Sequence, residues 1–88
     1  MIEKELTVLN RLGLHARSAA MVVRAASGFK SAISVRRGEV GVDGKSLMGL
    51  MLLAAEQGAR LTVRAEGPDE KEAMARIENL FEARFDED

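Results

Sequence analysis

The sequence contains no cysteine, tryptophan or tyrosine, and it has one proline and three phenylalanines. Without cysteine the chain has no disulfide framework, no thiolate nucleophile and no zinc site of the usual cysteine type, so redox chemistry is not expected. The lack of Trp and Tyr removes the stacking platforms on which small α+β RNA-binding sheets hold bases. The formal net charge of −1 comes from interspersed signs, so we expect no nucleic-acid partner.

Long apolar runs are also missing. No stretch approaches the length of a membrane span, and the first five residues lack the basic start and apolar run of a secretory signal. We therefore expect a cytoplasmic protein with no membrane insertion. The 88 residues, of which 47% are apolar and 31% charged, suit one globular domain over 1–88. The acidic end over 85–88 is expected to be solvated and frayed.

Alternation of apolar and polar residues predicts four strands, each with one buried face. They are expected over 2–9, around Ile33 to Val35, around Val40 to Val42, and over 60–65, the last ending at Gly67. Between the second and the third strand, Gly38-Glu39 suits a hairpin with glycine first in a tight turn.

Helical spacing predicts three helices. The first has apolar positions from Ala16 to Ala26, with Gly28 at the C-cap position. The second is capped by Ser46, covers Leu47 to roughly Ala54 and is closed by Gly58. The third follows Pro68, with Asp69 and Glu72 in capping-box spacing. Its apolar stripe consists of Met74, Ile77, Leu80 and Phe81.

The predicted element order is βαββαβα, and every strand has one apolar and one polar face. Such strands form a single sheet with helices on one side and water on the other. The fold class is therefore α+β, an open-faced β-sandwich.

His15 is the one histidine of the chain, at the junction between the Gly13-Leu14 loop and the first turn of the first helix. Unpaired backbone N–H groups at such a position, including those of Ala16 and Ser18, favour neutral imidazole and would stabilise an attached phosphoryl group. Arg17 can add positive charge and forked hydrogen bonds to phosphoryl oxygens. The structural alternative is that His15 is a helix-entry residue and Arg17 a solvated charge.

Other chemistry at His15 has less support. Metal binding would need a second His or Cys, so no metal or cofactor is expected. Ser18 lies three residues along the same helix, which does not suit hydrolytic Ser–His geometry.

The segment 45–53 is apolar around nearly the whole circumference of a short helix. Exposed apolar patches often mark docking surfaces, and methionines adapt to several partners. Leu47, Met48 and Met51 are the candidates; the alternative is that they fill gaps in the core. A phosphoryl group on Ser46 would be tolerated by the helix, so its effect would fall on docking.

Gly13-Leu14-His15-Ala16-Arg17 and the segment 45–51, KSLMGLM, closely resemble the two signature regions of HPr. HPr is the family of histidine-containing phosphocarriers of the phosphoenolpyruvate:sugar phosphotransferase system. The resemblance extends to the length, the element order, Ala25-Ala26-Ser27 and Ala65-Glu66-Gly67, so it covers essentially the whole chain.

The resemblance implies a monomeric carrier that is not an enzyme. His15 would take a phosphoryl group from phospho-enzyme I on Nδ1 and pass it to the IIA component of a sugar permease, while Arg17 balances charge. Ser46 matches the family's regulatory serine, modified in some bacteria by an HPr kinase/phosphorylase. The antiparallel strand order would be 1-4-2-3, with three helices on one face. Partner docking is expected at Leu47, Met48, Met51, Ala20 and Arg24.

Two residues depart from the family pattern. Ser18 stands where a proline commonly follows His-Ala-Arg, and Leu12 stands where small polar residues are frequent. Ser18 adds an N–H and a hydroxyl that either cap the helix or approach the phosphoryl group. A regulatory paralogue, controlling other proteins through His15 or Ser46, is the alternative function. A small-molecule-binding module would need a glycine-rich ligand loop or polar cleft, which the sequence does not supply.

Overall fold

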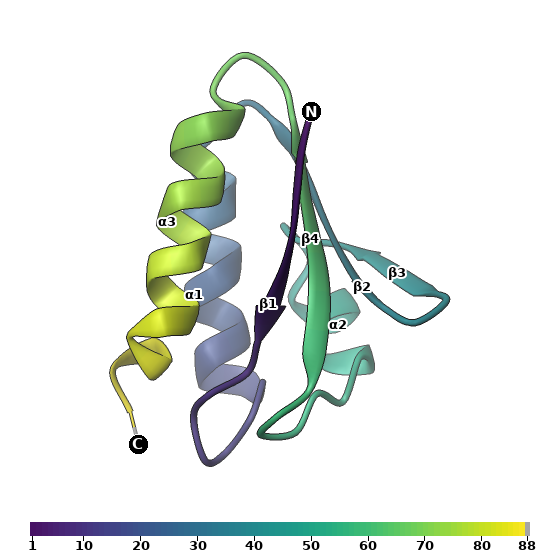
Figure 1. Cartoon of the computed structure of the whole chain (residues 1–88), viewed down its shortest axis with the longest axis vertical. Helices are drawn as coiled ribbons and strands as arrows, with labels where there is room; N and C mark the ends of the chain where they lie inside the picture. The colour runs from purple at the N-terminus through teal and green to yellow at the C-terminus, as the bar shows by residue number, and fades with distance from the viewer. Residues whose placement is uncertain (88) are drawn as a thin grey trace.

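A four-stranded antiparallel sheet forms one layer of the molecule, and the helices form the other (Figure 1). The computed structural model describes residues 1–87. The strands are β1 (Ile2–Thr7), β2 (Ala32–Arg37), β3 (Val40–Asp43) and β4 (Arg60–Glu66), and their order across the sheet is β1-β4-β2-β3. Both the fold class and the strand order implied by the resemblance are therefore confirmed.

Strand β4 shows why the sheet is open on one face. Leu61, Val63 and Ala65 are buried, whereas Arg60 and Arg64 are exposed. The strand pairs with β1 on one edge and with β2 on the other. Alternation of side chains therefore directs one set into the core and the other into water, as the sequence predicts.

The helices α1 (Ala16–Ser27), α2 (Leu47–Leu52) and α3 (Glu70–Glu82) cover the buried face of the sheet. Helix α1 packs against both α2 and α3, while α3 also contacts β1 and β4 (Figure 1). The large fully buried side chains of the helices include Val22, Met74 and Ile77. Each such side chain stabilises the fold by about 1.5–3 kcal/mol. This packing fixes the start of α1 relative to α2.

Two predicted boundaries are too long. Strand β1 ends at Thr7 rather than Leu9. Helix α2 ends at Leu52, because Leu53 and Ala54 donate i→i−3 bonds to Leu50 and Met51, and Ala54 adopts a φ of 47°. This left-handed residue turns the chain before it reaches Gly58. The predicted hairpin is confirmed, with Gly38 at a φ of 60°.

The predicted capping box of α3 is wrong. Asp69 is the N-cap residue, but its side chain makes no cap hydrogen bond. Its carboxylate instead accepts hydrogen bonds from the backbone N–H groups of Lys30 and Ser31 at 2.8 and 2.9 Å, and from the Ser31 hydroxyl. Asp69 therefore ties the start of α3 to the loop before β2. That tertiary contact has no signal in the local sequence.

The prediction of a frayed acidic end is also wrong. After α3 the chain forms a short 3₁₀ turn, η1 (Arg84–Asp86), whose three residues have φ values of 54° to 58°. Phe85 is fully buried, with its ring 5.0 Å from that of Phe81 in an edge-to-face arrangement. The next residue, Glu87, is partly buried. The remaining residue of the predicted frayed end, Asp88, lies outside the described residues.

No helix within residues 1–87 has the length and apolar character needed to cross a membrane.

Candidate functional site

His15 is the N-cap residue of α1, at the end of a loop that packs against the segment following α2. The Leu14 N–H donates to the Ala55 carbonyl at 2.8 Å, and the buried Asn10 side chain donates to the Gly13 carbonyl at 2.7 Å. Gly13 has a φ of 72°, and a Cβ there would lie 2.5 Å from the Ala55 oxygen. Only glycine fits this close approach of two backbones. The loop therefore holds His15 beside the C-terminal end of α2.

The two nitrogens of the His15 ring have different surroundings. The backbone N–H of Arg17 points at Nδ1 from 3.4 Å, a long and weak hydrogen bond. On the other edge, Nε2 lies 2.8 Å from Oε1 of Glu87. The side chain as a whole is 32% exposed. The ring is thus oriented by two partners and remains open to solvent.

Glu87 belongs to this site, and sequence reasoning missed it. Its Oε1 also accepts a hydrogen bond from the Asn10 amide at 2.7 Å. The hydrogen bond from the His15 ring lowers the pKa of the Glu87 carboxyl; partial burial opposes this, and the Asn10 amide and the Arg17 charge add to the lowering. Glu87 stands 72 residues from His15, and no motif or periodicity connects two positions so far apart.

Ser18 stabilises the start of helix α1. It is fully buried, and its hydroxyl accepts the His15 backbone N–H at 3.0 Å while lying 3.0 Å from the Gly13 carbonyl. The sequence left open whether this hydroxyl caps the helix or approaches the phosphoryl group, and in the structure it caps the helix. The cap fixes the backbone of His15 rather than its ring.

Comparisons with known proteins agree with this geometry. A family model described as "PTS HPr component phosphorylation site" matches residues 2–83. The phosphocarrier protein HPr of Treponema pallidum is 48% identical over 88 residues, covering 100% of both chains, and that of Xylella fastidiosa Temecula1 is 50% identical, covering 100% of this chain and 99% of the relative. The chain belongs to the HPr family. The crystal structure of HPr-C-His from Thermoanaerobacter tengcongensis superposes with a TM-score of 0.96 at 42% identity, covering 100% of this chain and 99% of that one.

As an HPr protein, the chain is a phosphocarrier of the phosphotransferase system, and the family consists of carriers rather than catalysts. Phosphotransferase-system proteins are its partners. The match to the family model ends at residue 83, so Glu87 lies outside the part of this HPr chain that defines the family.

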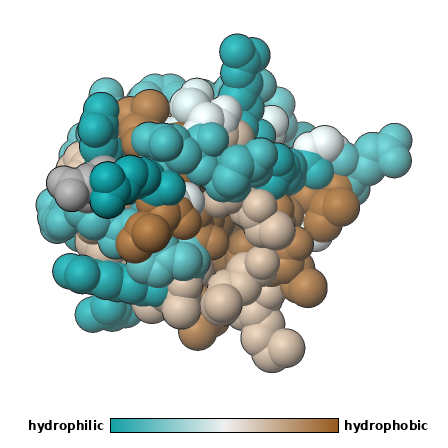
Figure 2. Space-filling model, turned by 90° about the horizontal axis from the view of Figure 1, so that it is seen from below, coloured by the Kyte–Doolittle hydropathy of each residue, from teal (hydrophilic) through white to brown (hydrophobic). Residues whose placement is uncertain are grey.

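Helix α2 carries an exposed apolar surface on this HPr chain. Met48 is 79% exposed and Met51 45% exposed, so they do not fill core gaps. Two further exposed apolar residues lie beside them, Leu52 on α2 and Leu12 in the loop before His15, which are 75% and 69% exposed. We call the exposed side chains of Leu12, Leu47, Met48, Met51 and Leu52 the apolar patch. Figure 2 shows apolar side chains gathered on the end of the molecule where α1 begins.

A hollow between α1 and α3 brings together three arginines. Arg17 and Arg24 come from α1 and Arg76 from α3, with Met21 and Leu80 among the other lining residues. Arg24 was an expected docking residue, and it is exposed; Ala20, one turn before it, is partly buried. Arg76 was missed, because its place beside α1 depends on the packing of two helices.

Ser46 caps α2, as predicted. Its hydroxyl accepts the backbone N–H of Gly49 at 3.0 Å, and the residue is partly buried. Gly49 packs close to Ser46 and to Val42 of β3, where an added Cβ would lie about 3.1–3.3 Å from their side-chain atoms. The glycine that weakens the helix therefore permits its contact with the sheet.

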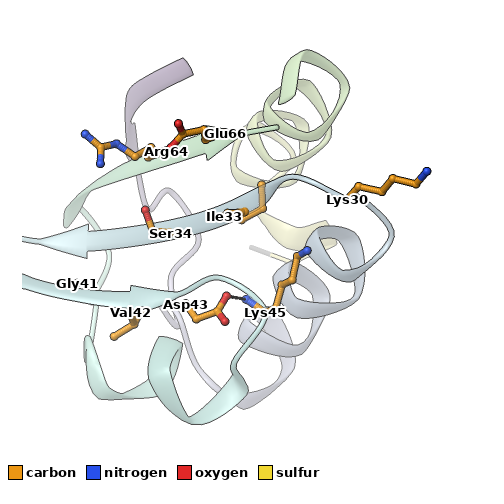
Figure 3. A pocket seen from close by; sticks show the side chains of 10 residues that line it. Lys30, Ile33, Ser34, Gly41, Val42, Asp43, Lys45, Arg64 and Glu66 are labelled. Carbon is orange, nitrogen blue, oxygen red and sulfur yellow. Dashed lines mark hydrogen bonds between the residues drawn. The ribbon is translucent and has the colours of Figure 1, made fainter. Parts of the chain in front are cut away.

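A second hollow lies between β2, β3 and the loop before α2 (Figure 3). Lys30 and Arg64 extend away from it, and Nζ of Lys45 donates to the Phe29 carbonyl at 2.9 Å. The carboxylate of Asp43 accepts the Lys45 backbone N–H at 2.9 Å. These groups are engaged with the chain itself or directed outward, so they do not converge on a ligand. His15 is not among the lining residues.

Proposed function

We propose that His15 is the phosphoryl acceptor and donor of this HPr protein, taking the group on Nδ1 from phospho-enzyme I and passing it to a IIA component. The observation that carries the proposal is the place of His15 at the N-cap of α1, with Nδ1 facing the first turn of the helix. A helix start offers backbone N–H groups and partial positive charge to an anion. The proposal places the protein in the cytoplasm, where these partners work.

The transfer is an exchange between two nitrogens. The lone pair of Nδ1 forms a bond to phosphorus while the donor nitrogen takes back the electrons of the bond that breaks. Nδ1 gives up only a 3.4 Å hydrogen bond from Arg17 N–H, so little stabilisation is lost. The phosphoryl oxygens can then accept hydrogen bonds from the backbone N–H groups of Ala16, Arg17 and Ser18. The Arg17 guanidinium is a further donor and adds positive charge.

We infer that partners dock on the apolar patch and on the arginines beside it. Leu47, Met48 and Met51 offer adaptable apolar contact, with Ala20 and Arg24 at the edge toward α1. Arg17, Arg24 and Arg76 favour a partner surface rich in carboxylates. Chemical-shift changes on addition of enzyme I are expected in this region, and changes confined to the open face of the sheet would contradict it.

Ser46 is proposed as a regulatory site, modified by an HPr kinase/phosphorylase where that enzyme occurs. A phosphoryl group on a helix N-cap meets the favourable end of the helix dipole, so α2 is expected to persist. The added charge would stand beside Leu47 at the edge of the apolar patch, where it would weaken docking.

The test is phosphorylation by enzyme I and phosphoenolpyruvate, followed by intact mass and phosphorus NMR. One acid-labile phosphoryl group per chain is expected in the wild type and in Ser46→Ala, and none in His15→Asn. Asparagine retains a side-chain oxygen for the N-cap, so the variant should still fold. An unmodified wild type, with an enzyme I active on another HPr, would reject the proposal and leave regulation through Ser46 as the function to pursue.

A further inference from the structure

Glu87 faces the edge of the His15 ring opposite to the proposed phosphoryl-accepting nitrogen. We propose that Glu87 is a positioning residue for phosphoryl transfer: its carboxylate keeps the imidazole proton on Nε2, which leaves Nδ1 free to accept the group and allows the ring to leave later as neutral imidazole. This inference rests on the proposed function of His15. It assigns a role to a residue outside the part of the chain that matches the family model.

The carboxylate is held in place from several directions. Its side chain is 12% exposed, less than that of His15 at 32%. The same oxygen accepts hydrogen bonds from His15 Nε2 at 2.8 Å and from the buried Asn10 amide at 2.7 Å. Two residues earlier, the fully buried Phe85 anchors the segment. A freely moving surface ion pair has no such support, and it contributes little.

Both hydrogen-bond partners of the His15 ring favour the tautomer with its proton on Nε2. Neutral imidazole has one N–H and one nitrogen with a lone pair. An ionised carboxylate only accepts hydrogen bonds, so the nitrogen beside Glu87 is the one that carries the proton. On the other edge the Arg17 backbone N–H only donates, so Nδ1 carries the lone pair. The lowered pKa of Glu87 keeps its carboxylate ionised at neutral pH.

The charge of Glu87 matters most after transfer. When Nδ1 bonds to phosphorus, Nε2 keeps its proton and the ring becomes cationic. A carboxylate at hydrogen-bond distance stabilises that cation. In the onward step the Nδ1–P bond breaks, its electron pair returns to the ring, and the retained Nε2 proton makes the leaving group neutral imidazole rather than an anion. The charged groups at the ring in this step are Glu87 and Arg17.

The experiment compares Glu87→Gln and Glu87→Ala with Asp86→Asn. Glutamine keeps an oxygen acceptor without the charge, and alanine removes both. Asp86 is exposed in the neighbouring turn and has a positive φ, which asparagine tolerates. Asp86→Asn therefore removes one negative charge from the same region of the chain without removing the contact with His15.

The first readout is the Nε2 proton of the unphosphorylated protein in nitrogen-edited proton NMR. A resonance protected from exchange is expected in the wild type and Asp86→Asn, and it should be lost in Glu87→Ala. The measurement needs no phosphoryl transfer, so it tests the contact even if His15 proves not to be the acceptor. A signal unchanged in Glu87→Ala would overturn the inference.

The second readout is the phosphorylated protein. In a pH titration of its phosphorus resonance, the midpoint is expected to fall by about one pH unit in Glu87→Gln. Onward transfer to a IIA protein should slow by up to about tenfold, because one pH unit is a tenfold change in the protonation constant. Midpoint and rate equal to those of Asp86→Asn would reject the role of Glu87, whereas a wild type that takes no phosphoryl group on His15 would reject the proposed function instead.

Discussion

Ser18 links helix α1 to the backbone of His15 and to the loop before it, at the scale of a single residue. Its buried hydroxyl bonds to the backbone of His15 and to the loop at Gly13. The proline common at this position in the family restricts the first turn by fixing φ, whereas serine restricts it by hydrogen bonds. The departure from the family pattern therefore changes the means by which the turn is held and leaves the imidazole ring untouched.

Ser18→Ala tests this capping. The change is expected to cost about 1 kcal/mol in the free energy of unfolding, because the His15 N–H loses an acceptor. For a domain of this size that corresponds to a fall in Tm of about 4–8 °C. Thermal unfolding followed by circular dichroism measures it, with the exposed Ser27→Ala as the control. Equal Tm values for the two variants would contradict the capping role.

At the same scale, the sequence predicted Ser46 as the cap of a short helix and placed His15 and Arg17 at the start of the first helix, and the structure has both helices beginning there. Sequence reasoning missed Asn10 and Glu87, which meet only through the tertiary fold. Asn10 is fully buried, and no pattern in the neighbouring sequence distinguishes it from the exposed residues that follow it. The position of the histidine was predictable from its neighbours, but the position of its carboxylate was not.

At the scale of elements, the strands and helices were predictable because apolar residues repeat at periods of two and of about 3.6. The errors fall where an element ends through a tertiary contact. Helix α2 stops early as Leu53 and Ala55 turn into the core, and Asp69 bonds to the loop before β2 instead of capping α3. Turn η1 was missed because Phe85 is a single apolar residue followed by acidic ones, and one residue cannot show a repeating apolar pattern.

The η1 turn depends on Phe85. Its three residues have left-handed backbone, which is unfavourable for residues other than glycine, and the burial of the Phe85 ring opposes this cost with about 1.5–3 kcal/mol in addition to its contact with Phe81. Phe85→Ala is therefore expected to release residues 84–87 from the body of the protein. Amide exchange there should accelerate at least about tenfold, and the protected Nε2 proton should disappear.

The control for this prediction is Phe29→Ala, which removes a partly buried ring at the other end of α1. Unchanged exchange in residues 84–87 of Phe85→Ala would show that the turn holds without its anchor.

At the scale of the whole molecule, Asp69 makes the free energy of unfolding depend on pH in the acidic range. Its hydrogen bonds, first from the Ser31 hydroxyl and then from the Lys30 backbone, lower its pKa from 3.8 to about 2. The folded state therefore binds fewer protons than the unfolded chain between these values. The stabilisation is complete above about pH 4 and is lost as the pH falls through about 2.

Asp69→Asn should remove this dependence. The wild type is expected to be more stable than the variant at neutral pH, with the difference shrinking between about pH 4 and pH 2. Urea unfolding at several pH values measures it. Glu72→Gln, on the exposed first turn of α3, controls for the loss of one carboxylate, and a difference that is constant over this pH range would contradict the assignment.

Met1 and the last described residue, Glu87, lie near opposite ends of α3 (Figure 1). The amino group of Met1 pairs with Glu70 at 2.8 Å near the start of α3, whereas Glu87 sits on the imidazole at the other end of that helix. An affinity tag, fusion partner or surface linker joined after residue 88 would therefore begin two residues after Glu87, which contacts His15. The same addition before Met1 would disturb an exposed ion pair of small energetic value, so the amino terminus is the place to attach this protein to a column, a dye or a chip.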